Sequence, residues 1–127
     1  MITMKRMAIV CIVLLAACTK QNHGLYNVLD YGAVGDSVTM DRQAMQKALD
    51  AAYENGGGTV IVPAPGRYLT GTLWLRDNVT LEVQAGATIL GSDNLEDYDS
   101  VRWGHNDDRC PYHLIMAKDA KNVTLQG

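Results

Sequence analysis

Apolar and polar positions follow a helical period over one stretch of this chain, residues 41–55. Its apolar residues share a single stripe of a helix: Ala44, Met45, Ala48, Leu49 and Ala52. Three glycines follow at 56–58, and glycine readily adopts the left-handed conformation that ends a helix. The pattern predicts an amphipathic helix over about 41–55, with Thr39 or Asp41 capping its first turn.

After Gly58 the helical period gives way to short β-branched and apolar runs bounded by Gly, Pro, Asn or Asp. A further short strand is expected within 25–32, before a turn at 32–37. Such strands can form a sandwich, a barrel or a β-helix. The runs predict strands at 59–62, 68–70, 72–75, 79–83, 88–90, 114–117 and 123–125.

One tetrapeptide recurs among these strands. Asn-Val-Thr-Leu at 78–81 returns at 122–125, a spacing of 44 residues that fits two coils of about 22. The recurrence and the irregular turns favour a β-helix, although chance repetition of a common strand-entry sequence explains the tetrapeptide equally well. In a β-helix, the helix at 41–55 would cover the open end of the first coil, with Met45 and Leu49 facing the strands.

The first residues have the pattern of an export signal. Lys5 and Arg6 precede an apolar run at 7–17, whose 11 residues are too few for a bilayer core that needs roughly 20. Leu15-Ala16-Ala17-Cys18 then resembles the lipobox of bacterial lipoproteins, in which the cysteine carries the lipid. We expect a signal peptide at 1–17, a lipidated Cys18 with a polar tether over 18–24, and a lipid-anchored protein of the cell envelope, periplasmic or surface-exposed. The alternatives are a simple cleaved signal and a short buried strand, with a cysteine there by chance.

Charge and cysteine content narrow the expected partners. Lys5 and Arg6 leave with the signal, so 9 of the 11 basic residues remain against 14 acidic residues. This balance argues against nucleic acid or an anionic lipid surface as a partner, and leaves the lipid anchor as the expected contact with a membrane. Cys11 lies in the signal and Cys18 is the lipid candidate, so Cys110 is the one cysteine left for pairing in the mature chain. No internal disulfide and no cysteine-based metal site is therefore expected. No cofactor or metal is expected.

The region 93–113 is polar and aromatic, without a clear period, and is long for a connection in a compact domain. Its candidate substrate-binding residues are Arg102, Trp103 and Arg109, which could line a sugar subsite by stacking and charge pairing. Anchoring of the loop itself is the alternative role for these side chains. The Asp-Asp pair at 107–108 and His105 lack the neighbours of a catalytic motif and are interpreted as parts of a solvated loop.

Several blocks of sequence together resemble the N-terminal signature of the pectate-lyase-like β-helix superfamily. They are NVLDYGAVGD at 27–36, AMQKALDAA at 44–52, GGGTVIVP at 56–63 and GRYL at 66–69. The segments 73–75, 78–81 and 86–92 are similar to the polygalacturonase group, glycoside hydrolase family 28. Two departures fall in loops: Ser37 replaces a usual glycine, and Ala64-Pro65 adds a residue to a usual bend.

The resemblance implies an all-β fold, a right-handed single-stranded parallel β-helix. Residues 25–127 would form its first coils and the helix at 41–55 its N-terminal cap. The implied activity is hydrolysis of galacturonosyl bonds in pectic polysaccharide or oligogalacturonide with inversion, in which one carboxylic acid protonates the leaving oxygen and another activates water. The alternatives are a polysaccharide lyase or uronate epimerase on the same fold, and an inert, truncated or glycan-binding fragment.

The catalytic motifs of that family lie on later coils. They are Asn-x-Asp, Asp-Asp, Gly-His-Gly and Arg-x-Lys, and none of them can be placed in this sequence. We therefore expect no catalytic residue within these 127 residues, and we expect the chain alone to be inactive although its parent protein is an enzyme.

Overall fold

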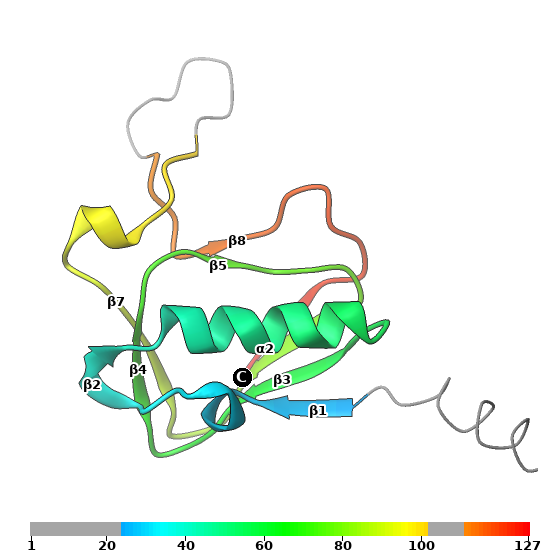
Figure 1. Cartoon of the computed structure of the whole chain (residues 1–127), viewed down its shortest axis with the longest axis horizontal. Coiled ribbons are helices and arrows are strands. Elements are labelled where there is room, and N and C mark those ends of the chain that lie inside the picture. The colour runs from blue at the N-terminus through cyan, green and yellow to red at the C-terminus, as the bar shows by residue number, and fades with distance from the viewer. Residues whose placement is uncertain (1–23, 102–110) are drawn as a thin grey trace, which may run out of the picture.

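Parallel strand pairing organises the part of the chain that the structure describes, residues 24–101 and 111–127 of a computed structural model. The strands form three parallel sheets (Figure 1). The first sheet has the order β1 (Gly24–Asn27), β3 (Gly58–Val62), β6 (Val79–Val83) and β9 (Thr124–Gln126). The second has the order β2 (Asp36–Met40), β4 (Arg67–Thr70) and β7 (Thr88–Gly91). The third pairs β5 (Leu73–Trp74) with β8 (Ile115–Met116).

These sheets are the faces of stacked coils, so the predicted parallel β-helix is confirmed. The length of a coil varies, however, and the expected repeat of about 22 residues is wrong for the Asn-Val-Thr-Leu pair. Thr59 pairs with Thr80, which gives a coil of 21 residues. Thr80 pairs directly with Thr124, so the two tetrapeptides lie on neighbouring coils, separated by one coil of 44 residues. The additional residues fall between β7 and β8 and include the 3₁₀ helix η2 (Leu95–Asp97).

The single predicted helix is confirmed as α2 (Arg42–Glu54). Figure 1 shows α2 lying across the space enclosed by β3, β4 and β5, and it contacts β1, β3, β5 and β6. Met45 and Leu49 are fully buried, as their places on the apolar stripe predicted, and each contributes roughly 1.5–3 kcal/mol by leaving water. Gly56 and Gly57 have φ of 89° and 120° and end the helix as expected.

The cap of α2 differs from the prediction. Asp41 occupies the N-cap position but makes no side-chain hydrogen bond to the first turn. Its carboxylate instead accepts hydrogen bonds from the backbone N–H groups of Val34 (2.8 Å) and Gly35 (2.9 Å). Thr39 donates its hydroxyl to Asp36 and is likewise not the cap. Asp41 is 1% exposed, so this buried carboxylate fastens the preceding loop to the start of the helix.

The segment before α2 contains more structure than the sequence predicted. The expected strand within 25–32 is β1 followed by the 3₁₀ helix η1 (Val28–Tyr31), and β2 begins inside the predicted turn. β2 pairs with β4 through Asp36↔Arg67 and Met40↔Leu69, with a register shift between the two pairs. Ser37 lies in this irregular stretch at φ 70°, the left-handed region that favours the glycine it replaces.

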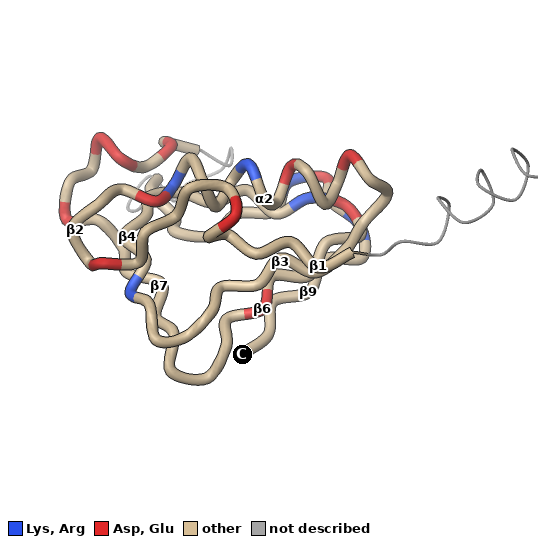
Figure 2. The backbone as a smooth tube through the Cα atoms, turned by 60° about the horizontal axis from the view of Figure 1, so that its bottom comes forward, with Lys and Arg blue, Asp and Glu red and all other residues tan. Residues whose placement is uncertain are grey.

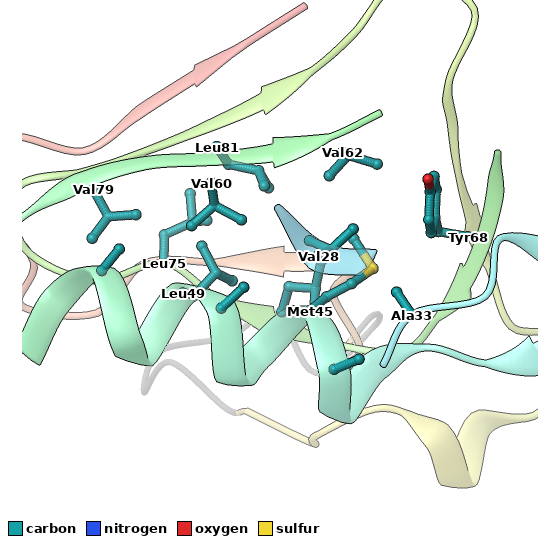
Figure 3. Close-up of a cluster of buried hydrophobic side chains, with 14 residues drawn as sticks. Val28, Ala33, Met45, Leu49, Val60, Val62, Tyr68, Leu75, Val79 and Leu81 are labelled. Atoms are coloured by element: carbon teal, nitrogen blue, oxygen red, sulfur yellow. The ribbon is translucent and has the colours of Figure 1, made fainter. Parts of the chain in front are cut away.

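The core is built from side chains of all three sheets and α2 (Figure 3). Val60 of the first sheet, Tyr68 of the second and Leu73 of the third are at most 1% exposed, and Met45 and Leu49 from the helix are fully buried. Outside the core, Asn78 and Asn122 hold φ of 60° and 56° at the same bend of neighbouring coils, and the Asn122 amide donates to the Asn78 side-chain oxygen at 3.0 Å. The recurring asparagines therefore mark a structural bend.

Charged residues are unevenly distributed over this framework. Figure 2 shows them gathered along α2 and the loops near it. The bends at 63–66 and 84–87, at the opposite side, carry no charged residue. Ionic recognition by the described residues is therefore concentrated around α2.

Candidate functional site

The residues predicted to have a function lie outside the described part of the chain. Cys18, Arg102, Trp103 and Arg109 all fall in the ranges 1–23 and 102–110. What the structure describes are the two ends of the second range. Ser100 and Tyr112 form an isolated antiparallel bridge, and the Val101 N–H donates to the Pro111 carbonyl at 2.9 Å. The chain thus leaves and re-enters the described framework at adjacent points.

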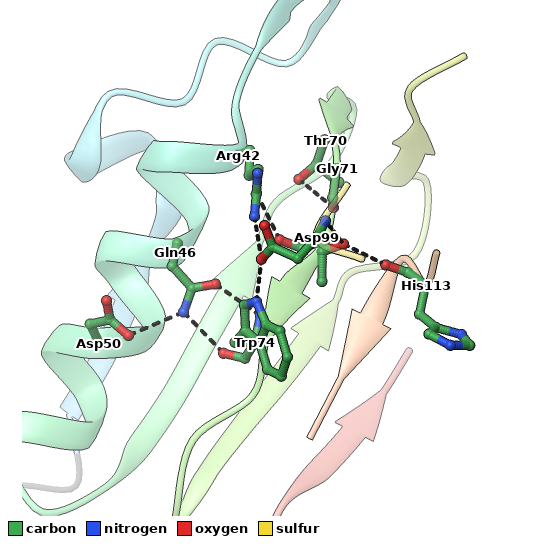
Figure 4. A network of polar contacts seen from close by, with 9 residues as sticks. Arg42, Gln46, Asp50, Thr70, Gly71, Trp74, Asp99 and His113 are labelled. Carbon is green, nitrogen blue, oxygen red and sulfur yellow. Dashed lines mark hydrogen bonds and ion pairs between the residues drawn. The ribbon is translucent and has the colours of Figure 1, made fainter. Parts of the chain in front are cut away.

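Asp99 fastens this exit point to the cap and the strands (Figure 4). Its carboxylate accepts hydrogen bonds from the Arg42 guanidinium and from the Trp74 indole N–H, both at 2.6 Å. Its backbone N–H donates to the Thr72 hydroxyl at 2.9 Å, and that hydroxyl donates to the His113 carbonyl at 2.7 Å. The hydroxyl of the buried Thr72 therefore contacts the chain on both sides of the 102–110 range, at Asp99 before it and at His113 after it.

The hydrogen bonds to Asp99 also set its protonation. The Trp74 indole N–H, followed by the Arg42 guanidinium, stabilises the charged form and lowers the pKa of the Asp99 carboxyl below its ordinary value. The pair is partly solvated, with side-chain exposures of 27% for Arg42 and 41% for Asp99. An ionised Asp99 at neutral pH is therefore an anchoring charge rather than a proton donor.

Gln46 holds the same strand from the helix side. Its side-chain oxygen accepts from the Trp74 backbone N–H at 2.9 Å, and its amide nitrogen donates to the Trp74 carbonyl at 3.0 Å. The same nitrogen also donates to Asp50 at 3.1 Å. The Gln46 side chain thus pairs with both the N–H and the carbonyl of Trp74, the second residue of the two-residue strand β5.

A hollow of about 410 Å³ opens beside this strand, between the C-terminal half of α2 and the turn after β8. It is lined by two aromatic side chains, two apolar residues and four charged residues: Tyr53, Trp74, Leu75, Arg76, Asp77, Lys118, Asp119 and Ala120. Arg76 lies over the Tyr53 ring, 4.2 Å from its centroid, and pairs with Asp50 at 2.8 Å. Aromatic surface next to fixed polar groups suits a small polar ligand with an apolar face.

A second hollow, of about 620 Å³, lies at the other end of α2 beside η2. Met40, Arg42, Gln43, Gln46, Glu96 and Asp97 line it. Arg42 is already engaged there, because it donates to the Thr72 carbonyl at 2.9 Å as well as to Asp99. Asp97 accepts a hydrogen bond from the Ser92 hydroxyl. The Arg42–Asp99 contact attaches the segment that follows η2 to the helix, so Arg42 and Asp97 already have partners in this hollow.

Within residues 24–101 and 111–127, no group of three or more His, Cys, Asp and Glu side chains is placed to hold a metal ion. No helix in the same residues is long and apolar enough to cross a membrane.

Sequence reasoning did not identify Asp99 or Gln46 as important. Asp99 meets partners that are 57 and 25 residues away, and Gln46 meets a strand 28 residues away. No local spacing connects such residues. Trp74 lies in segment 73–75, which resembles the polygalacturonase group. This resemblance was the one indication in the sequence that the neighbourhood of Trp74 could matter.

Comparisons with known proteins agree with this architecture. The family model described as "Rhamnogalacturonase A/epimerase, pectate lyase-like" matches residues 25–96. The exo-poly-alpha-D-galacturonosidase of Dickeya chrysanthemi is 49% identical over 72 residues, which cover 57% of this chain and 12% of that protein. The mannuronan C5-epimerase AlgE6 of Azotobacter vinelandii is 53% identical over 64 residues, which cover 44% of this chain and 7% of that protein.

A solved structure shows the same fold. The family 28 exopolygalacturonase of Yersinia enterocolitica superposes with a TM-score of 0.70 at 35% identity, over 80% of this chain and 19% of that one. The chain therefore spans a small part of the length of these relatives, and the matched part is the one that carries the helical cap and the first coils.

Proposed function

The chain belongs to the rhamnogalacturonase A/epimerase family of pectate lyase-like proteins, and from this membership we propose that it forms the capped first coils of an enzyme that hydrolyses galacturonosyl bonds in pectic polysaccharide. The supporting observation is the 49% identity with an exo-poly-alpha-D-galacturonosidase over 72 residues. The proposed hydrolysis proceeds with inversion, because that is the chemistry the resembling glycosidase group implies.

In this proposal, the described residues form the first coils, against which the later coils of the enzyme pair. Each coil pairs residue by residue with the coil before it, as Thr59↔Thr80 and Thr80↔Thr124 show. The first coil is covered by α2, whose Met45 and Leu49 are fully buried together with Val28 and Val60 of that coil. A capped first coil thereby sets the register for coils that carry catalytic groups.

A second candidate is uronate epimerisation, because 53% identity over 64 residues connects the same segment with a mannuronan C5-epimerase. Cap and first coils are common to both relatives, so their likeness does not discriminate between the reactions. A polysaccharide lyase on this fold is the third candidate, and a glycan-binding module without activity is the fourth. Fold alone leaves the chemistry open.

One assay separates these reactions. The protein expressed from its complete reading frame would be incubated with polygalacturonate and with polymannuronate, and products followed by reducing ends, ultraviolet absorbance and proton NMR. Hydrolysis releases reducing ends without absorbance, a lyase produces absorbing unsaturated ends, and an epimerase changes the anomeric signals without cleavage. New reducing ends from polygalacturonate, with the first product anomer inverted, are expected. Cleavage with absorbance, epimerisation, or no reaction would contradict the proposal.

We also propose that Arg102, Trp103 and Arg109 contact the sugar chain in that enzyme, Trp103 by stacking and the arginines by pairing with uronate carboxylates. Replacing any of them by alanine should raise KM and leave kcat nearly unchanged, because such contacts bind ground state and transition state alike. Arg67, an exposed residue of β4, provides a matched control. Unchanged KM in all three variants would refute this role.

For the N-terminal segment, we propose removal of residues 1–17, lipid attachment at Cys18, and a tether over 18–24 that holds the domain from residue 25 onward at the cell envelope. Metabolic labelling with an alkynyl fatty acid in a bacterial host tests this proposal. Label should be lost in Cys18→Ser and retained in Cys110→Ser. Equal labelling of the two variants, or no label in the parent protein, would contradict it.

A further inference from the structure

The hollow beside the C-terminal half of α2 has two aromatic side chains that are held in place by surrounding contacts. Trp74 is fixed through its indole N–H by Asp99 at 2.6 Å and through both backbone groups by Gln46. Tyr53 has the Arg76 guanidinium over its ring, 4.2 Å from the centroid, and stays 37% exposed. Rings that are fixed before a ligand arrives lose little conformational entropy on binding.

The polar lining of the hollow favours hydroxyl groups over carboxylates in a ligand. Asp77 and Asp119 both line it. Asp77 uses one oxygen to accept from the Lys121 backbone N–H at 2.9 Å, and carboxylate oxygens accept several hydrogen bonds each. These two lining carboxylates are therefore suitable acceptors for sugar hydroxyls.

The charges around the hollow disfavour an anionic ligand. Its cations are Arg76 and Lys118, and Arg76 is paired at 2.8 Å with Asp50. The lining itself holds two carboxylates, Asp77 and Asp119, against these two cations, and the charge of Arg76 is already offset by Asp50 outside the lining. A uronate carboxylate would bring a further negative charge to this group, at an energetic cost.

We propose that this hollow binds an uncharged sugar ring, with the apolar face of the ring on Tyr53 and Trp74 and its hydroxyls donating to Asp77 and Asp119. Its volume of about 410 Å³ is in the range of small-molecule sites. In a pectic polymer the uncharged ring is a methyl-esterified galacturonosyl unit or a neutral sugar. The choice of polymer rests on the proposed function, whereas the preference for an uncharged ring rests on the hollow. The first coils would thus hold an esterified stretch of polymer at the capped end of the β-helix.

The test compares two probes with the same sugar backbone: trigalacturonate, with three carboxylates, and its fully methyl-esterified form, in which each carboxylate is an uncharged methyl ester. The full chain, labelled with ¹⁵N, is titrated with each probe, and the Trp74 indole signal, assigned with Trp74→Phe, is followed by NMR. The ester should shift this signal and bind about fivefold more tightly than the acid, the effect of one like charge about 4 Å away in bulk water, which is the smallest effect expected for the one carboxylate that would enter the hollow. Tighter binding of the acid, equal binding, or no shift with either probe would overturn the proposal.

Matched variants locate the binding. Tyr53→Ala should abolish the ester-induced shift, whereas Tyr53→Phe, which keeps the ring, should preserve it. Asp119→Asn should weaken binding severalfold, and Asp93→Asn, an exposed aspartate outside the hollow, should not. The Trp74 signal without ligand should be the same in all four variants, which separates lost contacts from lost structure. An ester affinity that is insensitive to both Tyr53→Ala and Asp119→Asn would also overturn the proposal.

The outcome is independent of the catalytic assay. A complete protein that cleaves polygalacturonate while neither probe shifts Trp74 refutes this binding site and leaves the proposed hydrolysis standing. A protein that binds the ester as described but cleaves nothing refutes the hydrolysis and leaves the binding site standing.

Discussion

Gly71 lies where the segment after β7 crosses the strands, and substitution by alanine is expected to displace that segment. A Cβ atom at Gly71 would lie 1.6 Å from the Asp97 carbonyl oxygen and 2.6 Å from its carbon, whereas real Cβ contacts essentially never fall below 3.0 Å. The obstacle is backbone, so no side-chain rotation relieves the clash. Either the 92–99 segment or the β4–β5 corner must move by about 1.4 Å, a shift that a packed interior resists.

The contacts around Gly71 set the size of the effect. Movement of the segment strains the Ser92 N–H to Thr70 carbonyl bond (2.9 Å) and the Asp99 N–H to Thr72 bond (2.9 Å). It also strains the bonds from Arg42 and Trp74 to the Asp99 carboxylate. Neutral bonds contribute about 0.5–1.5 kcal/mol and bonds to a charged group about 1.5–3. Because Asp99 is partly solvated and loss would be incomplete, we expect Gly71→Ala to lower the free energy of unfolding by about 3 kcal/mol.

Urea denaturation followed by circular dichroism measures this loss, and the Trp74 indole NMR signal reports whether the Asp99 contact survives. Gly24→Ala is the matched control, because its added Cβ would meet only the Tyr26 ring at 3.4 Å, an ordinary contact distance. The control should remain within about 0.5 kcal/mol of the parent chain. A Gly71→Ala chain with parental stability and an unshifted Trp74 signal would refute the reasoning.

Three further substitutions test the helix α2, the irregular stretch before it that contains Ser37, and the contacts of Asp99. Leu49→Ala, at a fully buried position, should cost about 2–5 kcal/mol in urea denaturation, whereas exposed Lys47→Ala on the same helix should cost less than about 0.5. Ser37→Gly should stabilise the chain by about 0.5–1 kcal/mol, because relief of a left-handed serine at φ 70° exceeds the added flexibility of the unfolded chain; a lower melting temperature would contradict this. The lowered pKa of Asp99 means that its stabilisation is present above the ordinary value of 3.8 and is lost as pH falls through the folded value, so Asp99→Asn should flatten the acid side of a stability–pH curve. Parallel acid limbs in both chains would refute that assignment.

Local patterns predicted the elements whose causes are local. Met45 and Leu49 lie on one helical stripe, and the glycines after Tyr53 end the helix, so α2 was predicted to within a residue of each end. Coil length was not predictable in this way. The pairing of Thr80 with Thr124 depends on how much chain is inserted between β7 and β8, and no period in the sequence encodes the length of an insertion.

Non-local pairing explains the other failures. β2 was not predicted, because its partner strand begins about thirty residues later and its first residues belong to Gly35–Ser37, a stretch typical of turns. Asp41 was expected as a cap of the helix it precedes, but its carboxylate accepts hydrogen bonds from two backbone N–H groups six and seven residues earlier. The local capping rule gave the right position and the wrong partner, because tertiary structure offered a better one.

Trp74 belongs to both the Asp99 anchor and the proposed sugar-binding hollow, and this links two properties that would otherwise be independent. Its indole N–H donates to Asp99 in the segment that leads to residue 101, while the same residue lines the hollow. If the bound ring requires the Trp74 orientation that Asp99 imposes, only molecules in which the Trp74–Asp99 hydrogen bond is formed can bind. The apparent affinity is then reduced by the fraction of molecules in which this bond is broken. By reciprocity, a bound sugar must favour formation of the Trp74–Asp99 hydrogen bond by the same factor. The contact between Asp99 and Trp74 and the occupancy of the hollow would then be coupled through a single side chain.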